Sequence, residues 1–280
     1  MEAVAKAAGN KAAVRAGRIR RPARLIRRML VPLAIVIVWE VVIRSGIVQT
    51  PFLPSPSKVL ISWYQWIFGT HQGATDPYVG TWLDHAVQSS YRVLLGFAIA
   101  AVVGIVLGIL VGYFALFEDL FDPLIQIVRP IPITAWLPFA VIFFGIKTSS
   151  AVFLIALGAF FPIVVNTIAG VKRVPRTLIR AAQSLGCPRL HILPRVVLPA
   201  ALPAIFTGLR IGLGTAWVLV IVSEMLAVKG GLGFVLWDSY YYLRMDIIVA
   251  AMLSVGLLGF VSDLIMVAIA NYVLRWNEGR

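Results

Sequence analysis

The chain has 280 residues, of which 60% are hydrophobic and only 13% are charged, and its mean hydropathy is +0.91. Soluble domains carry about 25% charged residues, so this composition excludes an ordinary soluble globule. The net charge is +13, and the basic residues gather beside apolar segments, which favours a membrane protein over a nucleic-acid-binding one. The single cysteine, Cys187, excludes an intrachain disulfide and a multi-cysteine metal site.

Apolar segments fill most of the chain. A membrane helix takes about 20 apolar residues, and continuously apolar runs indicate helices, whereas barrel strands alternate. Six runs qualify, namely Met29–Val48, Val93–Phe117, Ile131–Ile146, Ala151–Val171, Ala201–Val228 and Ile247–Leu274. The sequence therefore predicts an all-α polytopic membrane protein with about six transmembrane helices.

The first run is interrupted by Glu40 and Arg44, whose spacing of four residues allows an ion pair. It follows a basic segment, residues 1–28, which we expect to lie in the cytoplasm against anionic lipid. Residues 49–84 are expected outside, with an interfacial helix over the aromatic stretch Lys58–Phe68. Residues 85–276 form the membrane core.

The distribution of Lys and Arg gives the orientation. Basic residues are dense before the first run and in the segment 172–200 between the fourth and fifth runs, and such segments stay in the cytoplasm. Six spans then place both termini in the cytoplasm. Within the core, Gly104, Gly108 and Gly112 flatten one helix face for close packing. The prolines around the third run, including Pro130 and Pro132, predict a kinked or irregular helix there.

No enzyme constellation can be assembled from the sequence. His71, His85 and His191 are scattered, and the string from Gly145 to Thr148 lacks the spacing of a nucleotide-binding loop. Any ATP must therefore be handled by another chain.

The most informative segment runs from Pro175 to Pro203. Leu178, Ala182 and Leu185 fall on one face of a short amphipathic helix over Arg176–Leu185. Gly186 is expected to end it with a positive φ, and Pro188 can open a second short helix. The pattern predicts two short helices that meet at a corner.

This segment resembles the EAA loop of permease subunits of bacterial ABC importers. The pattern is E-A-A, three residues, G, nine residues, I-x-L-P, and the chain matches its spacing, with Arg180 in place of Glu and Val196 in place of Ile. The matching residues are Ala181, Ala182, Gly186, Leu198 and Pro199, and the expected coupling loop adds Arg180, Gln183, Ser184, Leu185, Cys187, Pro188 and Arg189. The replacement of Glu by Arg180 reverses the charge at that position.

Further strings resemble permeases of the nitrate, sulfonate and taurine importers. They include Tyr91–Phe97, Arg129–Pro132 and Gly208–Gly214. The resemblance implies the type I ABC importer permease fold and a multi-pass subunit of the bacterial inner membrane that imports a small anion. It also implies two cytoplasmic ATPase subunits that hold ATP and Mg²⁺, an extracytoplasmic substrate-binding protein, and a second permease, which is either another copy of this chain or a related chain. No cofactor and no nucleic acid are expected on this chain.

Several polar residues within the spans are candidates for the translocation path or for intramembrane contacts: Thr134, Asn166, Arg210, Thr215, Ser223, Glu224 and Asp263. Ser and Thr in membrane helices commonly bond their own backbone. Arg210 and Asp263 lie at similar depth, which predicts an ion pair between the last two spans, with an anion-attracting Arg210 as the rival interpretation. The alternative function classes are an intramembrane enzyme and a carrier or channel that is not driven by ATP.

Overall fold

The structure is a computed structural model, and it describes residues 30–46, 53–70 and 76–277. The chain divides into two compact units, Met1–Trp63 and Tyr64–Arg280. Every regular element in the described ranges is a helix. The basic segment predicted over residues 1–28 lies outside them.

The first unit contains a helix over residues 30–44 and the start of α2 (Pro56–Phe68). The predicted pair is confirmed, because the Arg44 Nε atom lies 2.5 Å from the Glu40 carboxylate. The same carboxylate accepts hydrogen bonds from the backbone N–H of Ser57 at 3.0 Å and from its hydroxyl at 2.8 Å. Glu40 therefore satisfies donors at the N-terminus of α2, a role that the sequence does not reveal.

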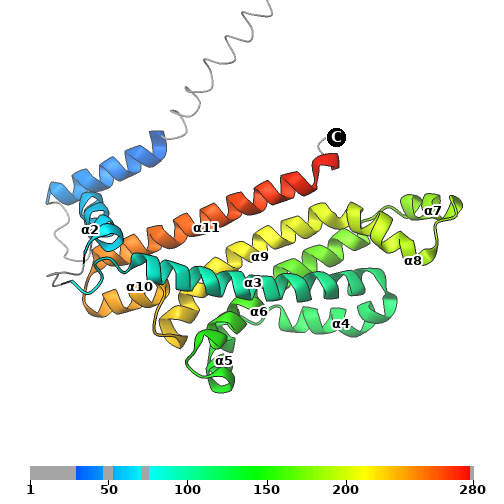
Figure 1. Cartoon of the computed structure of the whole chain (residues 1–280), viewed down its shortest axis with the longest axis horizontal. Coiled ribbons are helices and arrows are strands. Elements are labelled where there is room, and N and C mark those ends of the chain that lie inside the picture. The colour runs from blue at the N-terminus through cyan, green and yellow to red at the C-terminus, as the bar shows by residue number, and fades with distance from the viewer. Residues whose placement is uncertain (1–29, 47–52, 71–75, 278–280) are drawn as a thin grey trace, which may run out of the picture. The chain divides into compact units, whose positions relative to one another are not determined.

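Four long apolar helices dominate the second unit: α3 (Trp82–Tyr113), α6 (Thr148–Lys172), α9 (Leu198–Ala227) and α11 (Met245–Val273). They confirm the second, fourth, fifth and sixth predicted runs as helices. Figure 1 shows them running lengthwise, with α7 (Arg176–Ser184) and α8 (Arg189–Ile192) at one end and α10 (Leu232–Tyr241) at the other. We call these the α7 end and the α10 end.

Helices α3 and α6 pack closely and run in the same direction. The predicted glycine stripe makes this contact: Gly104 faces Ile163, Gly108 faces Thr167 and Gly112 faces Val171. A Cβ atom at Gly108 would lie 2.6 Å from the Cβ of Thr167, so the close approach requires glycine. Helix α9 runs antiparallel to α6, with Gly208 against Asn166 and Gly212 against Ile163.

The predicted irregularity of the third span is confirmed, but its predicted bounds, Ile131–Ile146, are wrong. The chain instead forms α4 (Ala115–Val128), a 3₁₀ turn η1 (Ile133–Trp136) and α5 (Leu137–Phe144), and the two halves meet at 93°. Pro130 and Pro132 cause the break because neither supplies a backbone N–H. Since α3 and α6 are parallel, the chain must return from the α7 end to the α10 end between them, which makes α4, η1 and α5 one broken span.

Candidate functional site

The loop predicted to couple with a partner folds as two short helices at a defined turn. Helix α7 ends in a Schellman motif, in which the Gly186 N–H donates to the Gln183 carbonyl and the Cys187 N–H donates to the Ala182 carbonyl, each at 3.0 Å. Gly186 has a φ of 78°, which confirms the predicted left-handed residue. Helix α8 then begins directly after Pro188. We call residues 176–192 the docking corner.

Buried side chains hold the docking corner to the bundle. Ile192, at the end of α8, is 1% exposed and joins a cluster with Val174 and Val197. Ile179 and Cys187 pack against the same cluster from the corner. A π-helical turn over Leu193–Val197 joins α8 to α9 without a break, so this half of the corner is continuous with the long span. A displacement of the corner is therefore transmitted to α9 rather than absorbed by a flexible loop.

The outer surface of the docking corner carries uncovered apolar side chains. Leu185 is 89% exposed and Leu178 is 48% exposed, although both belong to the predicted apolar face of α7. The side that packs on the bundle is formed instead by Ile179, with Ala182 half-buried. Exposed leucines on a rigid, anchored turn are typical of a surface that another protein covers.

The predicted ion pair between the fifth and sixth spans is confirmed. The Arg210 guanidinium donates from Nε to Asp263 Oδ1 at 2.9 Å and from Nη2 to Oδ2 at 2.8 Å. This two-bond geometry is the strongest that an arginine makes with a carboxylate. The side chains remain 47% and 40% exposed in the single chain. Lipid cannot solvate such a pair, so this face of the bundle requires protein or water beside it.

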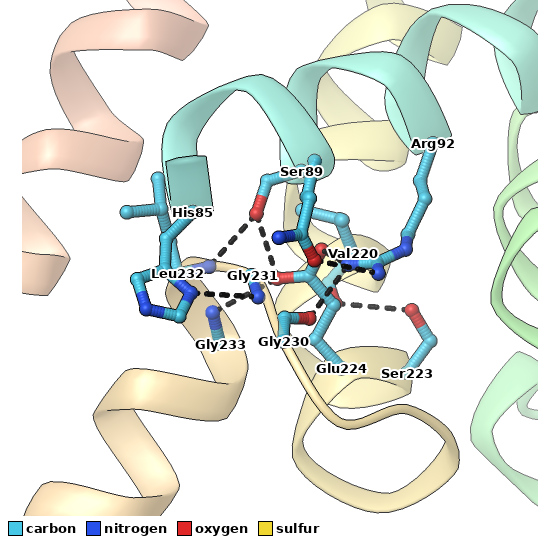
Figure 2. Close-up of polar contacts among 11 residues, drawn as sticks. His85, Ser89, Arg92, Val220, Ser223, Glu224, Gly230, Gly231, Leu232 and Gly233 are labelled. Carbon is cyan, nitrogen blue, oxygen red and sulfur yellow. Dashed lines mark hydrogen bonds and ion pairs between the residues drawn. The ribbon is translucent and has the colours of Figure 1, made fainter. Parts of the chain in front are cut away.

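Glu224 lies in a fully buried polar network near the α10 end, which Figure 2 shows. Its carboxylate accepts from Arg92 Nη1 at 2.6 Å, from the Ser89 hydroxyl at 2.8 Å and from the Gly233 N–H at 2.9 Å. Arg92 also donates to the Gly230 carbonyl at 2.7 Å. The network thus ties α3 to the end of α9 and to the turn that leads into α10.

Glycine is required in this turn. Gly231 has a φ of 113°, and a Cβ atom there would overlap the Glu224 carboxylate. The Gly231 N–H donates to His85 Nδ1 at 3.1 Å and the Leu232 N–H donates to the Ser89 hydroxyl at 2.8 Å. The Glu224 carboxylate, the Ser89 hydroxyl and the backbone amides of the turn therefore satisfy one another, whereas Arg92 Nε is buried without a hydrogen-bond partner among the described residues.

Further polar contacts lie at the α10 end. Arg244 Nη1 lies 2.7 Å from Asp76, and the other terminal nitrogen lies 3.0 Å from Asp246. These hydrogen bonds, first that of Asp246, raise the pKa of Arg244. The Tyr78 hydroxyl donates to Asp238 at 2.8 Å, and burial raises the pKa of Tyr78 to about 12. The phenol therefore stays protonated and remains a donor at neutral pH.

The remaining candidate residues are spread over three helices. Asn166, Thr215 and Ser223 each donate to a carbonyl of their own helix, those of Pro162, Ile211 and Val220, at 2.8, 2.9 and 3.0 Å. Thr134 is exposed in η1. The structure brings only two groups together, Arg210 with Asp263 and Glu224 with Arg92. Their role in a translocation path stays a prediction.

Two polar features are absent from the sequence-based candidates. Arg92 and Ser89, which complete the Glu224 network, flank an apolar run and were not singled out. Arg129, at the end of α4, lines a hollow beside α6, and the sequence marks it only as part of the family-like string Arg129–Pro132. Similar depth in the membrane predicts the pair of Arg210 and Asp263. The same reasoning applies to Arg92 and Glu224, because each lies toward the α10 end of its helix.

Comparisons with known proteins agree with this architecture. Residues 104–275 match the family described as binding-protein-dependent transport system inner membrane component. The chain is 36% identical to the taurine transport system permease protein TauC of Escherichia coli, over 86% of each chain. It is 35% identical to the nitrate import permease protein NrtB of a Synechocystis strain, again over 86% of each chain.

The fold is also that of a solved transporter. An inward-facing structure of the MetNI methionine ABC transporter superposes with a TM-score of 0.62 at 19% identity, covering 71% of this chain and 99% of the matched one. At that identity the likeness shows the fold alone. The family match and the relatives show that the chain belongs to the binding-protein-dependent transport system inner membrane components, the permease subunits of ABC importers.

Proposed function

We propose that the chain is the permease of an ATP-driven importer for a small solute with an oxyanion group, of the nitrate, sulfonate or taurine kind. Relatives named for taurine and nitrate, each about a third identical over most of the chain, support this substrate class. The chain forms the translocation path, and the chemistry of ATP belongs to its partners.

The proposed assembly contains two copies of this chain, two ATPase subunits that bind ATP and Mg²⁺, and a substrate-binding protein. The docking corner carries the proposal, because it is anchored to the bundle and joined to α9, while its outer side chains Leu178 and Leu185 are covered by nothing in the described residues. A groove in the ATPase that accepts Leu185 and Leu178 would cover it. The half-exposed ion pair of Arg210 and Asp263 supports a second copy or a water-filled path beside α9 and α11.

In the proposed orientation, the docking corner and both termini lie in the cytoplasm and the α10 end faces outward, across the inner membrane. The basic residues of the loop 172–200 support this orientation. This orientation can be tested with single cysteines in a Cys187→Ser background. One replaces Lys147, just before the start of α6, and the other replaces Arg176, which begins α7 beyond the opposite end of α6. A membrane-impermeant thiol reagent applied to intact cells should modify only the first, and modification of only the second would contradict the orientation.

Reconstitution tests the substrate class. The permease is purified with its ATPase, placed in liposomes, and supplied with the binding protein and with labelled taurine, ethanesulfonate or nitrate. We expect uptake of at least one of these that depends on ATP, and no uptake of a cation such as choline. ATP-dependent uptake of choline without uptake of any oxyanion would refute the proposed substrate class.

A further inference from the structure

Helix α4 has three distinct faces. Phe117, Phe121, Ile125 and Val128 pack against α3 and α6. Leu116, Leu120, Leu124 and Ile127 form an exposed apolar stripe, each between 56% and 69% exposed, which suits lipid. The third face is polar and is formed by Asp119, Asp122, Gln126 and Arg129, at helical spacings of three and four residues. We call it the polar stripe.

A lipid-facing helix has no use for a polar stripe. Charged side chains within a membrane face a water-filled space or a protein partner, because lipid cannot solvate them. Gln126 donates to Asp122 at 2.6 Å, one turn away, and Arg129 follows at the break between α4 and η1. The stripe therefore runs from the α7 end of the bundle to the break in the span.

Arg129 differs from the other arginines of the long spans. Arg92 is paired with Glu224 at 2.6 Å and Arg210 is paired with Asp263 at 2.8 Å. Among the described residues the Arg129 side chain makes no hydrogen bond or ion pair, and it is exposed, while its backbone N–H donates to the Ile125 carbonyl at 3.0 Å. Asp122, the nearest acidic residue on the stripe, is seven residues away, which is about 10 Å along a helix.

The surroundings of Arg129 form a hollow near the middle of the bundle. Its walls include Ile133 of η1, Pro162 and Asn166 of α6, and Ile211 of α9. The lining residues of α6 lie between Gly158 and Asn166, which is about 15–27 Å from the start of a helix about 37 Å long. Broken membrane helices commonly leave a binding site at this depth.

We propose that Arg129 binds the oxyanion group of the transported solute at this midpoint, with the polar stripe lining the water-filled path. The proposal rests on the proposed function and names the contact within it. A guanidinium offers a planar fork of N–H donors that matches two oxygens of a sulfonate or nitrate. Arg210 is less suited to this role, because the Asp263 carboxylate already neutralises its charge and accepts from Nε and Nη2. The anion-attracting role that the rival interpretation gave to Arg210 is therefore assigned to Arg129.

Thiol modification tests the site without transport. In a Cys187→Ser background, Gln126→Cys places a thiol one turn from Arg129 on the polar stripe. The ratio of its reaction rate with sulfonatoethyl methanethiosulfonate, itself a small sulfonate, to its rate with the trimethylammonium analogue gives the anion preference of the site in the assembled importer, where Asp122 lies on one side of the thiol and Arg129 on the other. Replacing Arg129 by Gln should lower this anion preference about tenfold, which corresponds to about 1.4 kcal/mol, because it removes the positive charge nearest the thiol on this stripe. Arg129→Lys should retain most of it.

Two outcomes of that experiment overturn the proposal. The first is an unreactive Gln126→Cys, which would mean that the stripe does not meet water. The second is an anion preference that Arg129→Gln leaves unchanged. Leu124→Cys, on the apolar stripe of the same helix, is the matched control and should stay unreactive toward both reagents.

Uptake separates failure of this proposal from failure of the proposed function. Arg129→Gln should keep its ATPase partner and the stimulation of ATP hydrolysis by the loaded binding protein, while oxyanion uptake per ATP falls about tenfold. Arg275→Gln, which removes a charge at the end of α11, should behave as wild type. Wild-type uptake by Arg129→Gln would refute only the role of Arg129. An assembled wild-type importer that moves no oxyanion would refute the proposed function instead.

Discussion

Arg210 and Asp263 face each other from α9 and α11 through two hydrogen bonds of 2.9 and 2.8 Å. Arg210 lies twelve residues after the start of α9 and Asp263 lies ten residues before the end of α11, or about 18 and 15 Å into the two antiparallel helices. Their opposite charges therefore meet at matching depth, where neither would be stable alone.

Removing either partner should destabilise the permease. Arg210→Ala or Asp263→Ala leaves one unpaired charge, and we expect a cost of about 2 kcal/mol, the lower limit for buried pairs, because both side chains are half-exposed in the single chain. The exchange of the two residues, Arg210→Asp with Asp263→Arg, should recover most of the lost stability. Thermal unfolding of the purified subunit measures this, and an exchange variant no better than the single variants would contradict the pairing.

The Glu224 network gives a larger predicted effect. Glu224→Gln keeps the shape of the side chain but leaves the Arg92 guanidinium, which is 5% exposed, without its counter-charge. The expected loss is about 3–5 kcal/mol, as for other buried pairs broken on one side. Ser223→Ala is the control one residue away, since Ser223 bonds only a carbonyl of its own helix. Equal melting temperatures for the two variants would show that the buried pair does not stabilise the fold.

Adding one methyl group to a glycine of α3 tests the close packing of α3 on α6. Gly108→Ala forces a Cβ atom to within 2.6 Å of Thr167, and overpacking of this kind costs about 1–3 kcal/mol. Gly214→Ala, on α9, meets nothing within 4 Å and should leave the stability unchanged. Melting temperatures in the same detergent compare the two, and an equally small effect at both positions would argue against the close helix contact.

The sequence predicts the long helices well because hydropathy reports length and burial in lipid directly. It fails at the third span, because an apolar run does not show direction, and α4 and α5 turn by 93° at Pro130 and Pro132. The prolines predict irregularity but not its angle. The parallel contact of α3 and α6, which only the structure shows, requires the chain between them to cross back to the α10 end.

The candidate site also contains features that the sequence predicts and features that only the packing of the helices reveals. Gly186 could be predicted because a helix C-terminus depends on local residues, and its φ of 78° confirms it. The Arg210–Asp263 pair could be predicted from depth alone. The partners of Glu224 and the isolation of Arg129 could not, because they depend on which helix faces which. Leu178 and Leu185 show the same limit, since the apolar face of α7 points away from the bundle.

We propose that the docking corner couples ATP hydrolysis in a partner to movement of this permease. Gly186→Val tests it, because valine scarcely adopts a φ of 78° and a Cβ atom at this position meets nothing within 4 Å, so strain rather than a clash alters the turn. Gly186→Asn is the matched control, since asparagine tolerates this conformation.

The direct measurement is ATP hydrolysis by the reconstituted importer with and without the loaded binding protein. Both variants should insert into the membrane at near-normal abundance, because the corner lies outside the long spans. Gly186→Val should lose the stimulation by the binding protein or release the ATPase subunit, whereas Gly186→Asn should retain both. Wild-type stimulation and ATPase binding in Gly186→Val would contradict the account of this corner.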